Sequence, residues 1–557
     1  MKKNHGLFGA VAILTVIMSL VLLQNPVTAQ EYVSVMDITA HDIHQKVLGP
    51  QTTGVVMEGY NDRKDYHEIR YISVNTGSDI DGDGSRGRPW ASITHTLEQI
   101  NDARLSRRYA LLVGAGKYEE GEIFMKEFVH LYGGFDPGSW SRDIVRYTTR
   151  VDGKGQHRLI TAADHSKIDG FMFVNGQVRG NGGAILCDGT SPVITNNQFR
   201  DNRSLGPDPW DPEFIHEIAN DGGAIAALNG ARPVIFSNLF AENSTVNGRG
   251  GAIGAHNRAA PRIQYNVFIG NRSGTDDPMR SSDGGAIAAS FYSDADIFFN
   301  LVIQNSALAS NDGGGIFSEM WSSMHIAGNI ILGNRSDDDG GGIYLSGSVH
   351  HYITGHEAKV PEERYLNRLV GNVIAGNRLR TPEGVSGGFR FTYFTRVYFN
   401  NNITYDNTGG LDFRRTHVSA ENNLVLEDVV VRENSKANFK SNRFFGELVT
   451  DDESVAETTD TRIADISKPD LFRISRTQFR DDSRQLEVQT AVYDPVQHVT
   501  TLAIRQDVTA DQLLINRVVS AGGNWSVIRD MARGQITLWG DHQDVTAVTI
   551  YPSFAKR

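Results

Sequence analysis

A repeated Gly-Gly motif constrains the fold of this 557-residue chain more than any other feature. The motif reads GGAI four times, GGGI twice, and then GGF and GGL, with its apolar residue at Ile185, Ile225, Ile253, Ile287, Ile316, Ile343, Phe389 and Leu411. Successive copies lie 22 to 46 residues apart. Self-similarity at such a period is typical of a solenoid, in which each repeat contacts only its neighbours.

A second motif, Asn-x-apolar, follows each Gly-Gly copy and begins at Asn197, Asn238, Asn266, Asn300, Asn329, Asn372, Asn402 and Asn423, with a further copy at Asn442. The two apolar positions are 14 or 15 residues apart in seven of eight copies, and the exception carries an insertion. One side of each repeat is therefore rigid, while the other accommodates loops. We expect the repeated Asn to stack at a turn and to hydrogen-bond along the coil.

The composition of the repeats predicts strands rather than helices. Each repeat contains two or three short alternating apolar segments and lacks the 3.6-residue periodicity of a helix. Gly-Gly inside every helix would also cost roughly 1 kcal/mol per glycine. The predicted fold class is therefore all-β, a parallel β-helix followed by a small C-terminal β module.

The pairing of GGAI with a following Phe-x-x-Asn, at residues 199–202, 240–243 and 268–271, carries a family resemblance. It resembles the right-handed parallel β-helix of the pectin-lyase-like superfamily, and especially the repeats of polymorphic outer-membrane proteins. The resemblance covers roughly residues 71–447. It implies a right-handed coil, but this superfamily contains lyases, hydrolases, epimerases and pure binding proteins, so it does not imply one function.

The N-terminus predicts export. Lys2 and Lys3 precede an uncharged apolar run at residues 7–23, and small residues at Val27 and Ala29 precede a cut before Gln30. This pattern is typical of a cleaved signal peptide at residues 1–29, with an uncleaved membrane anchor as the alternative. We therefore expect a secreted, cell-surface or periplasmic protein.

The rest of the chain divides into four parts by composition. Residues 30–70 are unassigned, residues 71–450 form the predicted β-helix, residues 451–465 are a predicted polar linker, and residues 466–557 form the predicted β module. No segment after the signal peptide is apolar enough to span a membrane. The expected protein is a monomer.

Charge and cysteine content exclude some classes of function. The chain has 54 Lys and Arg against 66 Asp and Glu, a net charge of −12, and no long basic run. Such a balance argues against nucleic acid as a partner. The sole cysteine, Cys187, excludes an internal disulfide framework and a Cys-based zinc cluster.

Alternation along the Gly-Gly strands predicts a candidate groove on the late repeats. If the motif's apolar residue points inward, the next and the third residue point outward. The late outward positions are Phe317, Tyr344, Arg390 and Asp412 in one column, and Glu319 and Arg414 in the other. Aromatic rings suit sugar stacking and a guanidinium suits a uronate carboxylate. The alternative is that Arg390 and Asp412 simply pair with each other on the surface.

These columns predict the chemistry of the groove. Glu319 and Asp412 lie three strands apart, about 14 Å, which exceeds the ~5 to 9.5 Å of glycosidase carboxylate pairs. A lyase acting by β-elimination would instead use Tyr344, Arg390 and Arg414 as catalytic residues. Its substrate would contact Phe317, Glu319, Asp412 and Trp210.

The expected partner is a polysaccharide or cell-surface glycan. One hypothesis is a secreted β-helix protein that binds an extended, uronate-containing polysaccharide and cleaves it by β-elimination. The alternative is a non-catalytic cell-surface or adhesive repeat protein. The regular GGAI repeats favour the second, and the Arg, Tyr and Glu residues on the late repeats favour the first.

Calcium is the one cofactor that the sequence suggests. Asp79, Asp81 and Asp83, followed by Gly84, match the first half of a calcium-binding loop. The twelfth position is Trp90, where an EF-hand has a bidentate Glu, so the second half is missing. A calcium site and a structural Asp/Gly turn both remain open.

Overall fold

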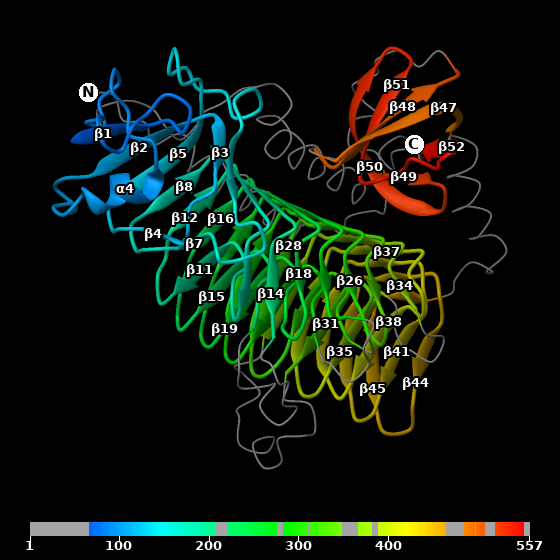
Figure 1. The fold of residues 1–557 in the computed structure, drawn as a ribbon. Helices are drawn as coiled ribbons and strands as arrows, with labels where there is room; N and C mark the ends of the chain where they lie inside the picture. Colours follow the sequence, from blue (N-terminus) through cyan, green and yellow to red (C-terminus); the bar gives the residue numbers. More distant parts are fainter. Residues whose placement is uncertain are drawn as a thin grey trace, which may run out of the picture.

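The computed structural model describes residues 66–206, 220–275, 282–309, 311–347, 366–380, 388–463, 484–495, 497–506 and 518–550. Figure 1 shows a long stack of coils with a small barrel beside it. The described part of the chain contains one α-helix, α4 (Ile93–Glu98), and otherwise β-strands. Within these residues no helix has the length and apolar character needed to cross a membrane.

One coil illustrates the architecture. β15 (Ile225–Leu228), β16 (Val234–Phe236), β17 (Leu239–Ala241) and β18 (Ser244–Thr245) follow one another around the coil. The next Gly-Gly leads into β19 (Ile253–His256), which pairs in parallel with β15 so that Ile225 lies opposite Ile253. Each strand therefore stacks on its own copy in the next coil, which confirms the predicted parallel β-helix.

Stacking produces four parallel sheets, numbered here by their order within a coil. Sheet 1 has twelve strands from β4 (Ile123–Phe124) to β44 (Leu448–Thr450), and sheet 2 has fourteen from β1 (Glu68–Ile72) to β45 (Val455–Thr459). Sheet 3 has thirteen from β3 (Gly116–Tyr118) to β46 (Arg462–Ile463), and the short sheet 4 has seven from β10 (Gln177–Arg179) to β34 (Arg378–Leu379).

The β-helix extends beyond its predicted end at residue 450. β45 pairs in parallel with β42 (Lys436–Lys440), and β46 pairs with β43 (Arg443–Phe444). The segment predicted as a linker, residues 451–465, is therefore part of the last coil as far as Ile463. Its polar composition misled the prediction, because its outward side chains are exposed on a terminal coil.

The interior of the coil is filled by stacked apolar side chains. The Gly-Gly apolar residues Ile185, Ile225 and Ile253 are fully buried. The phenylalanines of the Phe-x-x-Asn motif stack face to face, with ring centroids 4.8 Å apart for Phe199 and Phe240. Each coil thus places the same side chain above its copy, which explains the repeat.

Two ladders of buried asparagines run along the coil. In the first, between sheets 2 and 3, Asn238 Nδ2 donates to Asn266 Oδ1 at 3.0 Å. In the second, between sheets 3 and 4, Asn243 Nδ2 donates to Asn271 Oδ1 at 2.9 Å. The second ladder ends where Asn407 donates to Glu427 at 2.6 Å. The predicted stacking of the Asn-x-apolar motif is therefore confirmed, and the Asn of Phe-x-x-Asn forms a ladder of its own.

The Gly-Gly turn needs both of its glycines. Gly222 has φ +74°, and a Cβ there would lie 2.0 Å from the carbonyl oxygen of Ile225. Gly223 packs against the next coil, where a Cβ would lie 2.1 Å from Gly251 O. The first glycine therefore supplies the left-handed backbone, and the second allows neighbouring turns to approach each other.

The C-terminal module is a closed antiparallel barrel of six strands, in the order β47-β48-β51-β50-β49-β52. Its strands are β47 (Arg484–Asp494), β48 (Val499–Ile504), β49 (Val518–Ala521), β50 (Asn524–Ala532), β51 (Gln535–Trp539) and β52 (Ala547–Ile550). This confirms the predicted small β module.

The barrel docks on the outer face of sheet 3. Trp525, Val527 and Trp539 form one apolar cluster with outward residues of sheet 3, such as Leu301 and Ile303. Gln304 Nε2 in the β-helix also donates to Trp525 O at 2.6 Å. The barrel therefore covers part of one face of the coil.

Candidate functional site

The predicted column on sheet 1 has the expected register. Phe317, Tyr344, Arg390 and Asp412 lie opposite one another on β27 (Ile316–Ser318), β31 (Ile343–Ser346), β35 (Phe389–Thr392) and β38 (Leu411–Arg414). Their exposed fractions are 2%, 4%, 5% and 0%. The column points away from the coil interior and is nevertheless closed to solvent. Among the described residues, these four side chains are buried and do not line an open groove.

Ion pairs within the protein occupy the charged members of this column. Arg390 pairs with Asp339, and its Nε lies 3.7 Å from Asp412. Asp412 receives a bidentate pair of hydrogen bonds from Arg432, both at 2.9 Å. Arg414 pairs with Glu433 at 2.5 Å. The arginines predicted to neutralise a uronate are therefore already neutralised, in line with the surface-pairing alternative.

The remaining predicted residues on sheet 1, Glu319 and Tyr344, are also buried. Glu319 forms an ion pair with Arg249, whose Nε lies 2.8 Å from Glu319 Oε1. Burial raises the pKa of Glu319, and the charge of Arg249 opposes that rise. The Tyr344 ring stacks on Phe317 at 5.4 Å. Burial, and then the negative charge of Asp312, raise the pKa of Tyr344 well above its ordinary value. A buried phenol of this kind is a poor base for β-elimination.

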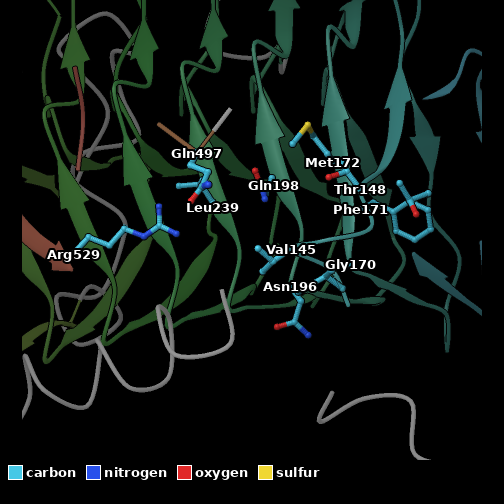
Figure 2. Close-up of a pocket in the computed structure, with 12 residues that line it drawn as sticks. Val145, Thr148, Gly170, Phe171, Met172, Asn196, Gln198, Leu239, Gln497 and Arg529 are labelled. Carbon is cyan, nitrogen blue, oxygen red and sulfur yellow. The ribbon is translucent and has the colours of Figure 1, made fainter. Parts of the chain in front are cut away.

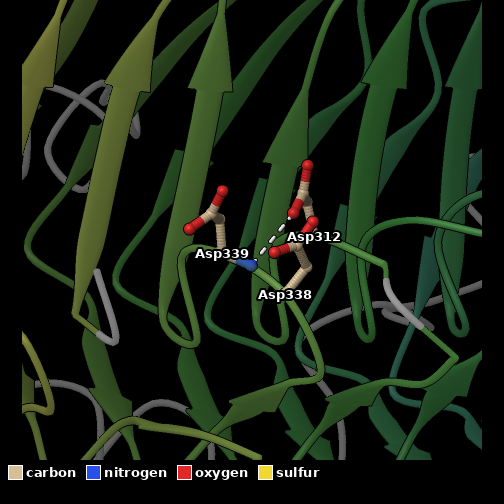
Figure 3. A group of neighbouring side chains, drawn as sticks. All are labelled: Asp312, Asp338 and Asp339. Atoms are coloured by element: carbon tan, nitrogen blue, oxygen red, sulfur yellow. Dashed lines mark hydrogen bonds between the residues drawn. The ribbon is translucent and has the colours of Figure 1, made fainter. Parts of the chain in front are cut away.

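A cluster of carboxylates lies at the Gly-Gly turns beside this network. Asp312, Asp338 and Asp339 place ligand atoms within 4.8 Å of one another, and Asp339 N donates to Asp312 Oδ1 at 3.0 Å (Figure 3). Burial and the charges of Asp283 and Asp338 raise the pKa of Asp312 well above its ordinary value. Carboxylates so placed could hold a cation, although Arg390 already supplies a positive charge to Asp339.

The carboxylates of the acidic loop, Asp79, Asp81 and Asp83, form hydrogen bonds that stabilise the loop. Asp79 accepts from Ala91 N and Ser92 N at 2.8 and 3.1 Å, directly before α4. Burial alone would raise the pKa of Asp79, but hydrogen bonds from Ser92 and Ala91 lower it overall.

The structure does not gather these three carboxylates around one point. Asp83 accepts from Ser85 N at 2.9 Å, and Asp81 lies 3.5 Å from Ser78 Oγ. Each therefore has its own partner in the loop, which agrees with the structural turn rather than the calcium site. Trp210, predicted as a stacking platform, lies outside the described residues.

An accessible groove lies instead on the outer face of sheet 2. It has a volume of about 650 Å³ and runs across the late strands β32 (Leu366–Val370), β36 (Arg396–Asn400), β39 (His417–Glu421), β42 and β45. Its lining residues are Leu366, Arg396, Val397, Tyr398, His417, Val418, Ser419, Lys436, Ala437, Asn438, Val455 and Glu457. The groove therefore follows the direction in which the coils stack.

Two rows of outward side chains give this groove its chemistry. Arg396, His417 and Lys436 lie opposite one another in the first row. Tyr398, Ser419, Asn438 and Glu457 form the second row, and the Tyr398 side chain is 43% exposed. An exposed ring can stack on a sugar, hydroxyl and amide groups can bind sugar hydroxyls, and the basic row can attract a carboxylate.

Sequence reasoning missed this groove because it followed only the Gly-Gly strands. The sequence does contain a signal for this groove, in the residues directly upstream of the Asn-x-apolar motif. Arg-Val-Tyr, His-Val-Ser and Lys-Ala-Asn each begin six residues before Asn402, Asn423 and Asn442 respectively. Polar-apolar-polar alternation at a fixed offset marks a strand with one buried face and one open face.

The comparisons with known proteins agree with this fold. Residues 160–358 match the family model described as a right handed beta helix region, which is 199 of the 557 residues. Together with the parallel sheets, this match makes the chain a right-handed parallel β-helix protein. No curated protein sequence matches the chain.

Solved structures with similar folds include two phage tailspikes and a glycosidase. The tailspike gp49 of Acinetobacter baumannii bacteriophage Fri1, a capsular polysaccharide depolymerase, has 10% identity and a TM-score of 0.27 over 88% of this chain and 87% of its own. A mutant tailspike of E. coli bacteriophage HK620, solved with a pentasaccharide, has 10% identity and a TM-score of 0.26 over 86% of this chain and 94% of its own.

The third structure is the GH136 lacto-N-biosidase of Eubacterium ramulus. It has 11% identity and a TM-score of 0.23 over 71% of this chain and 68% of its own. Likeness at these TM-scores carries no argument about function, which has to come from the groove itself.

Proposed function

We propose that this protein binds an extended, acidic polysaccharide along the groove on sheet 2. The observation that carries the proposal is the exposed Tyr398 ring beside a row of basic side chains on stacked strands. Neighbouring strands lie about 4.8 Å apart, so the groove offers similar contacts at regular intervals. A repeating surface of this kind suits a polymer better than a compact ligand.

The charge of the groove supports an acidic ligand. Arg396 and Lys436 are positive, His417 lies between them, and Glu457 is the one carboxylate among the lining residues. This basic row lies on a chain whose net charge is −12, so it is a local departure from the overall balance. A uronate carboxylate or a sulfate ester would be attracted to it.

The same groove favours binding over cleavage. Glycoside hydrolysis requires two carboxyl groups at a defined separation, and the lining residues supply one. The residues predicted for β-elimination, such as Tyr344 and Arg390, are buried on sheet 1. The proposal is therefore the non-catalytic alternative, a surface or adhesive protein that recognises a glycan.

The proposal includes an extracellular location. The predicted signal peptide at residues 1–29 would export the chain to the medium, the periplasm or the cell surface, where acidic polysaccharides are available. We propose that the exported protein acts as a monomer, because the groove is complete within one chain.

A glycan array and two variants test this function. The protein should bind acidic glycans in preference to neutral ones, and Tyr398→Ala should weaken binding at least about fivefold, since a lost ring contact costs on the order of 1 kcal/mol. Phe124→Ala removes an aromatic ring that is 63% exposed on an early strand of sheet 1, and it should leave binding unchanged. Binding of no acidic glycan, or equal loss in both variants, would refute the proposal.

A further inference from the structure

Two buried arginines lie where the barrel meets the β-helix. Arg200, on β13 (Gln198–Arg200) of sheet 3, and Arg529, on β50 of the barrel, are each 6% exposed. Arg200 Nη1 donates to Pro495 O in the barrel, so the two elements meet directly at this point. Both guanidinium groups are therefore enclosed at the interface between the two parts of the chain.

Neither guanidinium has a carboxylate partner among the described residues. Arg200 Nε and Nη2 are buried without a hydrogen-bond partner. Arg529 lies over the Trp539 ring, 4.9 Å from its centroid. Burial, and to a smaller extent the positive charge of Arg200, lower the pKa of Arg529 to about 10, although the charges of Asp530 and Asp494 oppose this shift. Two buried like charges without a directly paired carboxylate are unfavourable for docking.

A cavity lies beside Arg529 at the same interface. Its volume is about 90 Å³, and it is lined by residues of both parts, including Asn196 and Gln198 from the β-helix and Gln497 and Arg529 from the barrel. Figure 2 shows the Arg529 side chain extending toward the region of Leu239 and Gln497. The Gln198 side-chain amide also lines it and offers an Nε2 donor beside Oε1, which is buried without a partner.

The size of the cavity limits what can occupy it. A site of this volume holds several water molecules, since one requires roughly 10–15 Å³. It is far below the ~300 Å³ at which pockets for whole ligands begin. The occupant is therefore a small group rather than an entire oligosaccharide.

We propose that this cavity binds a carboxylate, sulfate or phosphate group through Arg529, with Gln198 Nε2 as a hydrogen-bond donor and Arg200 as a second positive charge nearby. The oxyanion would offset the charge of Arg529 and reduce its repulsion with Arg200, and would thereby stabilise the docking of the barrel on sheet 3. This proposal is independent of the groove on sheet 2, because the two sites share no lining residue.

Titration of the full chain with simple anions tests the site. Sulfate, phosphate and glucuronate would be added at constant ionic strength, with chloride and neutral glucose as controls, while tryptophan fluorescence and the melting temperature are recorded. We expect a saturable fluorescence change, because Arg529 contacts the buried Trp539 ring, and a rise in melting temperature from binding to the folded state. Response to sulfate and phosphate would identify a general oxyanion site, and response to glucuronate alone would identify a sugar acid.

Variants separate a specific site from a general salt effect. Arg529→Gln should weaken anion binding at least about tenfold, whereas Arg505→Gln, an exposed barrel arginine paired with Glu487 at 2.7 Å, should leave it unchanged. Gln198→Ala provides a second test if Arg529→Gln fails to fold, and it should also weaken binding. The proposal is overturned if no anion gives a saturable response, or if chloride matches the other anions. Unchanged affinity in both site variants would overturn it too.

Discussion

Removal of one ladder asparagine should destabilise the β-helix far more than its size suggests. Asn305 is fully buried in the second ladder, and its side chain makes four hydrogen bonds. Its Oδ1 accepts from the backbone N and the Nδ2 of Asn271, both at 2.9 Å. Its Nδ2 donates to Phe268 O at 3.2 Å and to Asn334 Oδ1 at 2.9 Å. Asn305→Ala removes all four bonds.

The expected loss follows from the number of buried bonds. A typical intramolecular hydrogen bond contributes about 1 kcal/mol net, so four bonds correspond to a loss of about 4 kcal/mol in the free energy of unfolding. The cost could not be avoided by rehydration, because the partner groups stay buried between coils. A loss of this size is a large share of the ~5 to 15 kcal/mol that stabilises a typical domain.

Denaturation in guanidinium chloride, followed by circular dichroism, measures this loss. Asn438→Ala is the matched control, because Asn438 is an exposed strand residue of sheet 2 outside either ladder. It should change the free energy of unfolding by less than about 0.5 kcal/mol. Equal effects of Asn305→Ala and Asn438→Ala would refute the argument that the ladder bonds stabilise the coil.

A charged substitution at the same position tests the direction of the bonds. Asn305→Asp keeps the acceptor for Asn271 but faces two acceptors, Phe268 O and Asn334 Oδ1, with a carboxylate. Burial raises the pKa of such a group, so the protonated form is favoured in the folded state. The variant should approach wild-type stability toward pH 4 and lose it as the pH rises through the folded pKa. Destabilisation independent of pH would contradict this reasoning.

Three further predictions concern the turns and the buried charges. Gly222→Ala places a Cβ 2.0 Å from a backbone oxygen and should lower the free energy of unfolding by more than about 2 kcal/mol. Gly230→Ala, at φ +79° in open space, should lower it only by the ~1 kcal/mol that left-handed backbone costs. Denaturation midpoints of the two variants compare these losses. Asp312→Asn should stabilise the protein at pH 8 and lose this advantage toward pH 4, because the raised pKa of Asp312 makes its ionisation costly only at higher pH. Denaturation at several pH values would contradict this if the stability difference between variant and parent stayed constant. Asp412→Ala should cost about 3 kcal/mol, because its two arginine partners lose their shared carboxylate, and a calorimetric loss below about 1 kcal/mol would contradict the pairing.

The coil was predictable from the sequence because its constraints repeat. Each turn of this kind needs a glycine pair such as Gly222 and Gly223, and the ladder asparagines recur at a fixed offset. The sequence of each copy therefore specifies its own local geometry. Register between coils followed from the same motifs, as the pairing of Tyr344 with Arg390 shows. The end of the coil was not predictable, since β45 and β46 pair with earlier strands without either motif.

The candidate site was less predictable, because exposure depends on side chains that are distant in sequence. Alternation places Arg390 on the outer side of sheet 1, but its burial results from the network that includes Asp339 and Asp412. Arg200 and Arg529 are more than 300 residues apart in the sequence but lie at the same interface, and no periodic pattern connects them. Local patterns therefore identified the face of each residue but not what covers that face.

The proposed glycan groove lies on sheet 2 because the outer faces of sheets 1 and 3 are partly occupied by other contacts within the protein. The strands of sheets 1 to 3 repeat from coil to coil, so the coils differ mainly in sheet 4, in their outward side chains and in their loops. Ion pairs such as that of Arg249 and Glu319 occupy the outer side of sheet 1 at its later strands, and the barrel, through Trp525, covers part of sheet 3. Sheet 2 keeps polar side chains and the Tyr398 ring open to solvent on its late strands. Because these side chains take no part in the ladders or the core, their substitution should change glycan binding while the free energy of unfolding stays the same.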